Sequence, residues 1–232
     1  WEHEYDCPYA ISYPAGPRCT PTVDGDRVYT LGAMGNLFCF RVTDGKVLWR
    51  HDFKKDFGAK TPIWGFAAHP LVDGDKLICL VGGAPDARVV AFDKMTGEEV
   101  WRVDRQERGQ NWATPFVWEN EVRTEIVTAG TQGVRSYDLD GNLLWEIHGM
   151  SGLTVPTPFA KHGLLYISSG YPGGGLRPVY VVKPGASGDI SLWSQDDMRT
   201  GLSSGFPGTR ASSEDVAWAY PLLGTYNTSA LV

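Results

Sequence analysis

The residue types that most often carry out chemistry are scattered through this chain rather than grouped. The sequence of 232 residues contains five histidines and four cysteines, and none of them has the close spacing of a zinc site. A glycine-rich stretch, Gly-Tyr-Pro-Gly-Gly-Gly at 170–175, has the glycine content of a phosphate-binding loop. It lacks the Lys-Ser/Thr pair and the following helix that such a loop needs, so we interpret it as a connection between strands.

Two of the cysteines could form a disulfide. Cys7 and Cys19 lie 12 residues apart in one connector. A bridge and two free thiols both remain open, because the sequence does not give the distance between the Cα atoms. Cys39 and Cys79 lie within apolar strands, and we interpret them as small buried hydrophobic residues.

A tryptophan recurs at similar intervals along the chain and marks its internal repeats. Trp49, Trp101 and Trp145 each follow a polar glycine turn and a short apolar run, with spacings of 52 and 44 residues. Self-similarity at this period indicates an array of one supersecondary unit, and for β-rich units it indicates a propeller. Propellers serve both as enzymes and as docking platforms, so the fold leaves the function open.

Each repeat predicts four short strands. A strand opened by proline, such as Thr20–Val23, is followed by a polar turn, an apolar strand, a glycine loop, a third strand and the tryptophan strand. Short strands with turn signals about every 8–12 residues are typical of antiparallel all-β folds. We therefore expect an all-β fold, a β-propeller of four-stranded antiparallel blades with very little helix. Its four repeats would be half of an eight-bladed ring.

The repeats also predict boundaries within a single partial propeller domain, 1–232. Residues near 1–4 match the last strand of a preceding blade, and 228–232 match the first strand of a further one. We therefore expect the remaining blades to come from the parent chain or from a second copy. The blades are expected at 19–52, 68–103, 113–147 and 156–219, the last with an insertion at 184–213.

The insertion decides which tryptophan belongs to the fourth repeat. Trp218 lies at the expected distance from the next strand start, whereas Trp193 lies inside the insertion. The glycine, serine and aspartate content of 184–213 predicts a surface loop. We therefore expect Trp193 to be more exposed than the repeat tryptophans.

The repeat tryptophans are expected to be structural. A large flat ring at one strand position can wedge between neighbouring blades, and burying it contributes about 3 kcal/mol or more. We assign this docking role to Trp49, Trp101, Trp145 and Trp218. In the turn before Trp101, Asp93 and Thr96 can bond backbone N–H groups, while Gly97 supplies the unusual dihedral angle.

The same stretch carries a family resemblance. Residues 91–101, Ala-Phe-Asp-Lys-Met-Thr-Gly-Glu-Glu-Val-Trp, match the A-x-D-x-x-T-G-x-x-x-W docking motif of pyrroloquinoline quinone (PQQ)-like propeller repeats, and 40–49 and 137–145 match it loosely. The chain thus resembles the PQQ-like, quinoprotein-type propeller family over essentially its whole length. It is most similar to non-catalytic propellers like the lipoprotein of the outer-membrane β-barrel assembly machinery. The resemblance implies a periplasmic, other cell-envelope or secreted location.

A second branch of that family consists of PQQ-dependent dehydrogenases, which hold PQQ and calcium. The resemblance implies adjacent cysteines for that branch, and the four cysteines here are all separated. Calcium needs several oxygen ligands, and no spacing singles out a set from the candidates Glu107, Asn111, Asp196 and Asp197. We therefore expect no cofactor, no metal and no catalytic residue, with a PQQ-dependent dehydrogenase as the alternative. A structural module attached to a kinase or other signalling domain also stays open.

Composition limits the partners. The net charge of −6 argues against a nucleic-acid platform, which usually needs a basic face. No apolar run approaches the roughly 20 residues of a membrane span, so we expect no transmembrane segment.

The loops predict where partners bind. The loops between strands two and three, and the connectors from strand four to the next strand one, lie on one face of a propeller. Aromatic and arginine residues on long loops are typical of binding faces, although any one aromatic could instead plug a connector onto its blade. We expect a protein partner or small ligand on this connector face. Its candidate residues are Tyr9, Tyr13, Arg18, Trp64, Phe66, His69, Arg88, Trp112, Tyr171 and Arg177.

Overall fold

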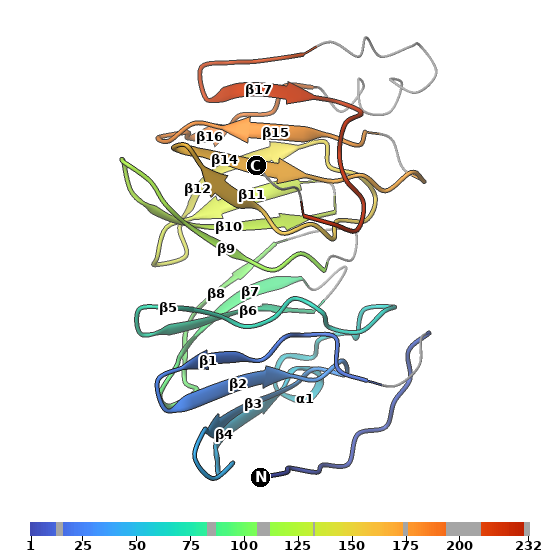
Figure 1. Cartoon of the computed structure of the whole chain (residues 1–232), viewed down its shortest axis with the longest axis vertical. Coiled ribbons are helices and arrows are strands. Elements are labelled where there is room, and N and C mark those ends of the chain that lie inside the picture. The colour runs from blue at the N-terminus through green and yellow to red at the C-terminus, as the bar shows by residue number, and fades with distance from the viewer. Residues whose placement is uncertain are drawn as a thin grey trace. The chain divides into compact units, whose positions relative to one another are not determined.

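A computed structural model of the chain describes residues 1–12, 16–82, 87–105, 112–131, 133–173, 176–193 and 210–229. It divides into two compact units, Trp1–Glu107 and Arg108–Val232. Almost all regular structure is antiparallel β-sheet (Figure 1), and α1 (Phe53–Phe57) is the only helix in the described ranges. The expected all-β propeller blades are confirmed.

The first unit contains two four-stranded sheets in which consecutive strands are neighbours. Glycine turns with positive φ, at Gly25 and Gly45 in the first sheet and Gly74 and Gly97 in the second, let the chain reverse between strands. The strands are β1 (Thr22–Asp24), β2 (Arg27–Leu31), β3 (Asn36–Arg41) and β4 (Val47–Asp52), then β5 (Leu71–Asp73), β6 (Lys76–Val81), β7 (Arg88–Asp93) and β8 (Glu99–Asp104).

The core of this unit lies between its two sheets. Tyr29, Leu37 and Cys39 from the first sheet belong to one buried cluster with Leu77 and Phe92 from the second. Since successive side chains of a strand point to opposite faces, Phe38 and Phe40 lie on the other face of the first sheet, where they form a smaller cluster. The helix α1 follows β4, and Asp52 caps it by accepting backbone hydrogen bonds from Lys54 and Lys55.

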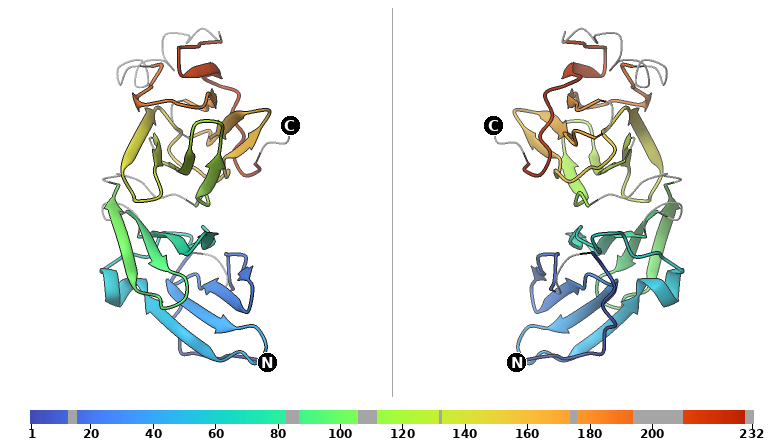
Figure 2. Two further views of the ribbon diagram at one scale, coloured as in Figure 1. Left: turned by 90° about the vertical axis from the view of Figure 1, so that its left-hand side faces the viewer. Right: turned by 90° about the vertical axis from the view of Figure 1, so that its right-hand side faces the viewer.

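The second unit also contains two sheets, and one of them has a fifth strand. Figure 2 gives two side views in which the last strand, β17, can be followed in red beside β15 in orange. The sheets consist of β9 (Phe116–Glu119), β10 (Thr124–Gly130), β11 (Gly133–Tyr137), β12 (Leu143–His148) and β16 (Gly188–Asp189), and of β13 (Phe159–Lys161), β14 (Leu164–Ser168), β15 (Val179–Val182) and β17 (Val216–Tyr220).

The extra strand changes our interpretation of the insertion. β16 pairs in parallel with β12 through Trp145 and Glu146, and Ala186 and Ile190 beside it are buried in the core of the unit. Trp193 is half-buried, with its ring 5.1 Å from that of Tyr180. The described start of the insertion is therefore packed rather than a free surface loop, because it covers the open edge of β12. The remainder, 194–209, lies outside the described residues.

Candidate binding face and the contacts that position it

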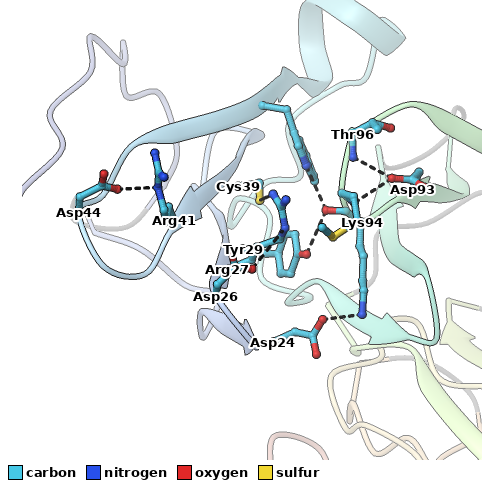
Figure 3. Close-up of polar contacts among 12 residues, drawn as sticks. Asp24, Asp26, Arg27, Tyr29, Cys39, Arg41, Asp44, Asp93, Lys94 and Thr96 are labelled. Atoms are coloured by element: carbon cyan, nitrogen blue, oxygen red, sulfur yellow. Dashed lines mark hydrogen bonds and ion pairs between the residues drawn. The ribbon is translucent and has the colours of Figure 1, made fainter.

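One carbonyl oxygen joins the two sheets of the first unit. The Lys94 carbonyl, in the turn between β7 and β8, accepts hydrogen bonds from Trp49 Nε1 at 3.1 Å and from Tyr29 Oη at 3.0 Å (Figure 3). The Lys94 ammonium also pairs with Asp24 Oδ2 at 2.6 Å. A single turn thus receives two donors and one charged contact from the neighbouring sheet.

The local structure of this turn explains why the Lys94 carbonyl can accept these hydrogen bonds. Asp93 Oδ1 accepts the backbone N–H groups of Met95 and Thr96, and the bond from Thr96 is the main reason that the pKa of Asp93 is lowered. Gly97 has a φ of +79°, a conformation that residues with a Cβ rarely adopt. A Cβ there would lie only 2.6 Å from Trp49 Cδ2, so the glycine also allows the indole to lie against the turn.

The N-terminal segment makes equivalent contacts with the first sheet. Trp1 Nε1 donates to the Val42 carbonyl at 2.8 Å and its ring lies against Gly45, as Trp49 lies against Gly97. His3 lies 4.9 Å from the Phe40 ring, and His51 lies 4.8 Å from Phe92. Residues 1–5 therefore occupy the position that the fourth strand of a neighbouring blade would take.

In the second unit the indole N–H of Trp145 has a different kind of acceptor. It is fully buried, and its Nε1 donates to Glu125 Oε2, a carboxylate of its own sheet, at 2.7 Å. Ser136 Oγ donates to the same oxygen, and Arg123 and Asn120 bind the other one. Trp49, Trp101 and Trp218 are each half-buried, as Trp193 is, so Trp145 alone among the repeat tryptophans is deeply buried.

A pocket lies beside this framework, on the connector face of the first sheet. It has a volume of about 450 Å³ and is formed by the N-terminal segment, the Gly16–Pro21 stretch and the loop after β2. We call it the connector pocket. Apolar, aromatic and sulfur-bearing side chains dominate its lining, notably Tyr5, Cys7, Tyr9, Cys19, Leu31 and Met34.

The two cysteines of this pocket are free thiols. Cys7 Sγ donates to Asn36 Oδ1 at 3.5 Å, and buried Cys19 donates to the Phe66 carbonyl at 3.3 Å. Burial raises the pKa of Cys19 to about 12, so it carries a proton at neutral pH. The disulfide that the spacing left open is absent, and both sulfurs contribute soft apolar lining instead.

A second, charged pocket adjoins the first at Tyr5. It has a volume of about 470 Å³ and lies against β3, β4 and α1. Its lining carries both signs of charge, from Asp6, Arg50, Asp52, Lys55 and Asp56. His51 also lines it, with Nδ1 3.2 Å from Asp56 Oδ2 and Nε2 2.7 Å from the Gly97 carbonyl oxygen. A ligand in the connector pocket would therefore meet a polar rim on this side.

The structure separates the candidate residues of the first unit into two kinds. Tyr9 lines the connector pocket, and its hydroxyl donates to the Gly16 carbonyl. Phe66 is buried against Phe53, and Arg88 is held by Asp104 and the Phe57 carbonyl, so both are structural. Arg18, Trp64 and His69 are half-buried, and burial lowers the pKa of His69. Tyr13 lies outside the described residues.

The candidates of the second unit differ in burial. Trp112 is buried, with its backbone N–H bonded to the Thr154 carbonyl, so it plugs a connector. Tyr171 and Arg177 are half-buried, and the Tyr171 ring lies 5.3 Å from that of Tyr226. A buried hydroxyl cluster of Ser151, Thr154 and Ser169 lies beneath this face.

The candidate residues of the connector face do not include three that line the connector pocket. Tyr5, Cys7 and Met34 lie in a connector or in the loop after β2, which are the loops that sequence reasoning assigned to this face. Their position in those loops was the available signal. Which loop residues line a cavity depends on how the N-terminal segment folds back over β3, and no local pattern encodes that path.

The described residues do not fit a calcium ion. No group of three or more His, Cys, Asp or Glu side chains within them is close enough to hold a metal. The carboxylates and amide considered for calcium, Glu107, Asn111, Asp196 and Asp197, all lie outside them. The described helix, α1, is also far too short to cross a membrane.

Comparison with known proteins agrees with the blade architecture. The PQQ_2 family model, described as outer membrane protein assembly factor BamB, matches residues 13–117 and again 80–171, together well over half of the chain. The chain belongs to this family. BamB from Moraxella catarrhalis matches this BamB-family chain with a TM-score of 0.53 at 18% identity, over 75% of this chain and 50% of that one.

Enzymes share the same fold. The quinohemoprotein alcohol dehydrogenase of Comamonas testosteroni matches with a TM-score of 0.53 at 17% identity, over 75% of this chain and 34% of that one. In sequence, polyvinylalcohol dehydrogenase of Sphingopyxis sp. (strain 113P3) is 26% identical over 160 residues, which are 68% of this chain and 23% of that protein. The BamB-family chain thus spans half or less of each of these relatives.

Proposed function

We propose that this chain is a non-catalytic binding scaffold of the bacterial cell envelope, which takes an apolar side chain of a protein partner into the connector pocket. The observation that carries this proposal is the composition of that pocket, in which Tyr5, Tyr9 and Met34 surround a volume of about 450 Å³. A small apolar ligand is the other occupant that this lining would accept.

The chemistry of the pocket supports a protein partner. Aromatic residues and methionine are enriched at protein interfaces, since they give large contact areas and adapt to irregular shapes. Ligand pockets are typically about 300–1,000 Å³, and this volume is near the lower end of that range. The neighbouring charged pocket, with Arg50 and Lys55 beside Asp6, supplies the polar rim that surrounds such an anchor site.

The family supports the location and the class of partner. The matching family is described as an outer membrane assembly factor, and a partner within the envelope would be a protein of that compartment. Since the chain spans only part of each relative, this assignment of partner and compartment is a proposal for the whole protein.

A photocrosslinking experiment tests the site. A benzoylphenylalanine introduced at Tyr9 should crosslink to one discrete protein of a bacterial envelope extract, identified by mass spectrometry. The matched control carries the crosslinker at Met95, an exposed residue of the turn between β7 and β8. Alkylating Cys7 should abolish the Tyr9 adduct by filling the pocket. Equal adducts at Tyr9 and Met95, or no adduct at Tyr9, would contradict the proposal.

A PQQ-dependent dehydrogenase is the second candidate, favoured by the sequence similarity to polyvinylalcohol dehydrogenase. It is tested by mixing the chain with PQQ and calcium. A bound quinone absorbance together with reduction of a dye by an alcohol would support the enzyme. We expect neither, because the described residues offer no calcium site.

A further inference from the structure

The charged pocket is built on one face of the first sheet. Asn36 and Phe38 of β3 are the direct cross-strand partners of Asp52 and Arg50 of β4, so these four side chains share a face. All four line the pocket. Tyr5 of the N-terminal segment closes one side of it, with its ring 4.9 Å from that of Phe38, and helix α1 closes another.

Most of the charges in this pocket already have partners. Asp52 Oδ1 accepts the backbone N–H groups of Lys54 and Lys55, and Asp52 Oδ2 lies 3.7 Å from Lys55 Nζ. Asp56 Oδ2 accepts the backbone N–H of Asp52 at 2.8 Å and lies 3.2 Å from His51 Nδ1. These contacts hold α1 against the end of β4, so the groups that make them have a structural role.

Two charged side chains of the lining remain, Asp6 and Arg50. Neither has a hydrogen bond or an ion pair within the described ranges of the chain, and they do not pair with each other. Asn36 Oδ1 accepts the Cys7 thiol at 3.5 Å, which leaves the amide NH₂ group of Asn36 as a further donor. The pocket thus offers a ligand one carboxylate, one guanidinium and one amide donor.

The balance of charge in the lining indicates the class of ligand. A simple anion bound at Arg50 would be repelled by the Asp6 carboxylate, and a simple cation bound at Asp6 would be repelled by the guanidinium. A ligand that carries one charge of each sign gives both groups a partner. The volume of about 470 Å³ suits a small molecule, and the rings of Tyr5 and Phe38 provide an apolar side to the pocket.

We propose that the charged pocket binds a free α-amino acid with an apolar side chain. The Arg50 guanidinium and the Asn36 NH₂ group donate to its carboxylate, since a guanidinium matches the two oxygens of a carboxylate. Asp6 accepts from its ammonium group, and the rings of Tyr5 and Phe38 contact its side chain. The three polar contacts lie outside the connector pocket, so this site does not depend on the proposed protein partner.

A nuclear magnetic resonance titration of the isotope-labelled chain with L-leucine tests the site. Saturable shifts of backbone amide resonances should centre on Asn36, Phe38 and Arg50. Isocaproate, which lacks the ammonium group, and leucinamide, which lacks the carboxylate, should each bind about tenfold more weakly or worse, because each loses a charge-assisted contact. The absence of saturable shifts at millimolar leucine would overturn the proposal, as would equal binding of the three compounds.

Three variants test the assigned contacts. Arg50→Gln and Asp6→Asn should each weaken leucine binding by about tenfold or more. Lys55→Gln is the matched control from the same lining, since its ammonium pairs with Asp52 and its side chain is 83% exposed, and it should change binding by less than about twofold.

The compounds and the variants together separate a direct contact from damage to the fold. In Arg50→Gln, leucine and leucinamide should bind alike, because the ligand carboxylate no longer meets the guanidinium, whereas isocaproate should remain the weaker ligand in Lys55→Gln. Circular dichroism would establish that each variant is folded. Equal losses in all three variants would overturn the proposal, as would a preference for leucine over leucinamide that survives Arg50→Gln.

Discussion

At the scale of single residues, the Glu125 carboxylate accepts the tryptophan hydrogen bond that a backbone carbonyl of another sheet accepts in the first unit. Trp49 donates to a carbonyl of another sheet, whereas Trp145 donates to a carboxylate of its own. Glu125 has no exposed side-chain surface, and both of its oxygens accept hydrogen bonds. A buried charge is tolerated when it is paired and fully hydrogen-bonded, so this site is sensitive to any change in donors and acceptors.

Glu125→Gln should destabilise the chain by about 1–3 kcal/mol, because an amide NH₂ group would face donors that now meet an acceptor. Urea denaturation measures this change in the free energy of unfolding. Glu119→Gln is the matched control at the exposed end of β9, and it should change stability by less than about 0.5 kcal/mol. Equal effects of the two substitutions would show that the Glu125 network contributes nothing specific.

Differences in burial also make the four cysteines differ in reactivity. Burial raises the pKa of Cys19, Cys39 and Cys79, which disfavours the thiolate that reacts, and Cys7 is the partly exposed one. Ellman's reagent at neutral pH should therefore modify one thiol of the native chain quickly and the other three only after denaturation. Cys7→Ser should remove the fast phase. A fast phase that survives this substitution would contradict the assigned burial.

At the scale of elements, the glycines of the turns have two separate roles, allowing a positive φ and leaving room for a docked tryptophan. Gly74 and Gly97 both have positive φ, at +54° and +79°, so each lets a hairpin reverse. A Cβ at Gly74 would meet nothing within 4 Å, whereas one at Gly97 would collide with the Trp49 ring. The pair therefore separates the cost of the backbone conformation from the cost of displacing the docked indole.

Gly74→Ala should cost about 1–2 kcal/mol, the cost of placing a Cβ in the left-handed region. Gly97→Ala should cost about 1–3 kcal/mol more, the range for overpacking a closely packed site. Chemical denaturation of both variants gives the difference, and quenching of Trp fluorescence reports whether the Trp49 indole becomes exposed. Equal losses of stability would mean that the indole contributes little to this turn.

At the scale of the whole molecule, the buried residues fall into separate clusters. The cluster around Tyr29 and Phe92 lies entirely in Trp1–Glu107, and the cluster around Trp145 and Tyr180 lies entirely in Arg108–Val232. Repeat architectures gain their stability from intrinsic and nearest-neighbour terms, so damage in one cluster should stay local.

Trp145→Ala should destabilise the second unit by about 3–5 kcal/mol, as large core truncations do. Hydrogen exchange followed by mass spectrometry should show lost protection in β10, β11 and β15 and unchanged protection in β2, β3 and β6. Uniform loss along the chain would show instead that the two clusters unfold as one cooperative body.

The blades and the turns between them follow from local patterns along the chain. The alternation of apolar residues, the Asp-Gly turns and the returning tryptophan are local patterns, and local patterns suffice because the strands within each repeat pair in sequence order, with the inserted β16 as the exception. The turn of Asp93, Thr96 and Gly97 was predictable for the same reason, since its hydrogen bonds span only a few residues.

The contacts between side chains that lie far apart in sequence depend instead on how the connectors fold and the sheets pack. The connector pocket joins Tyr5 and Tyr9 to the loop at Met34, and the Lys94 carbonyl joins Tyr29 to Trp49. Likewise, the start of the insertion pairs with β12 and carries Ala186 into the core. These contacts depend on the paths of connectors and on the packing of faces, which hydrophobic periodicity does not encode. The candidate binding face could therefore be assigned to its loops from sequence, but not to its pocket.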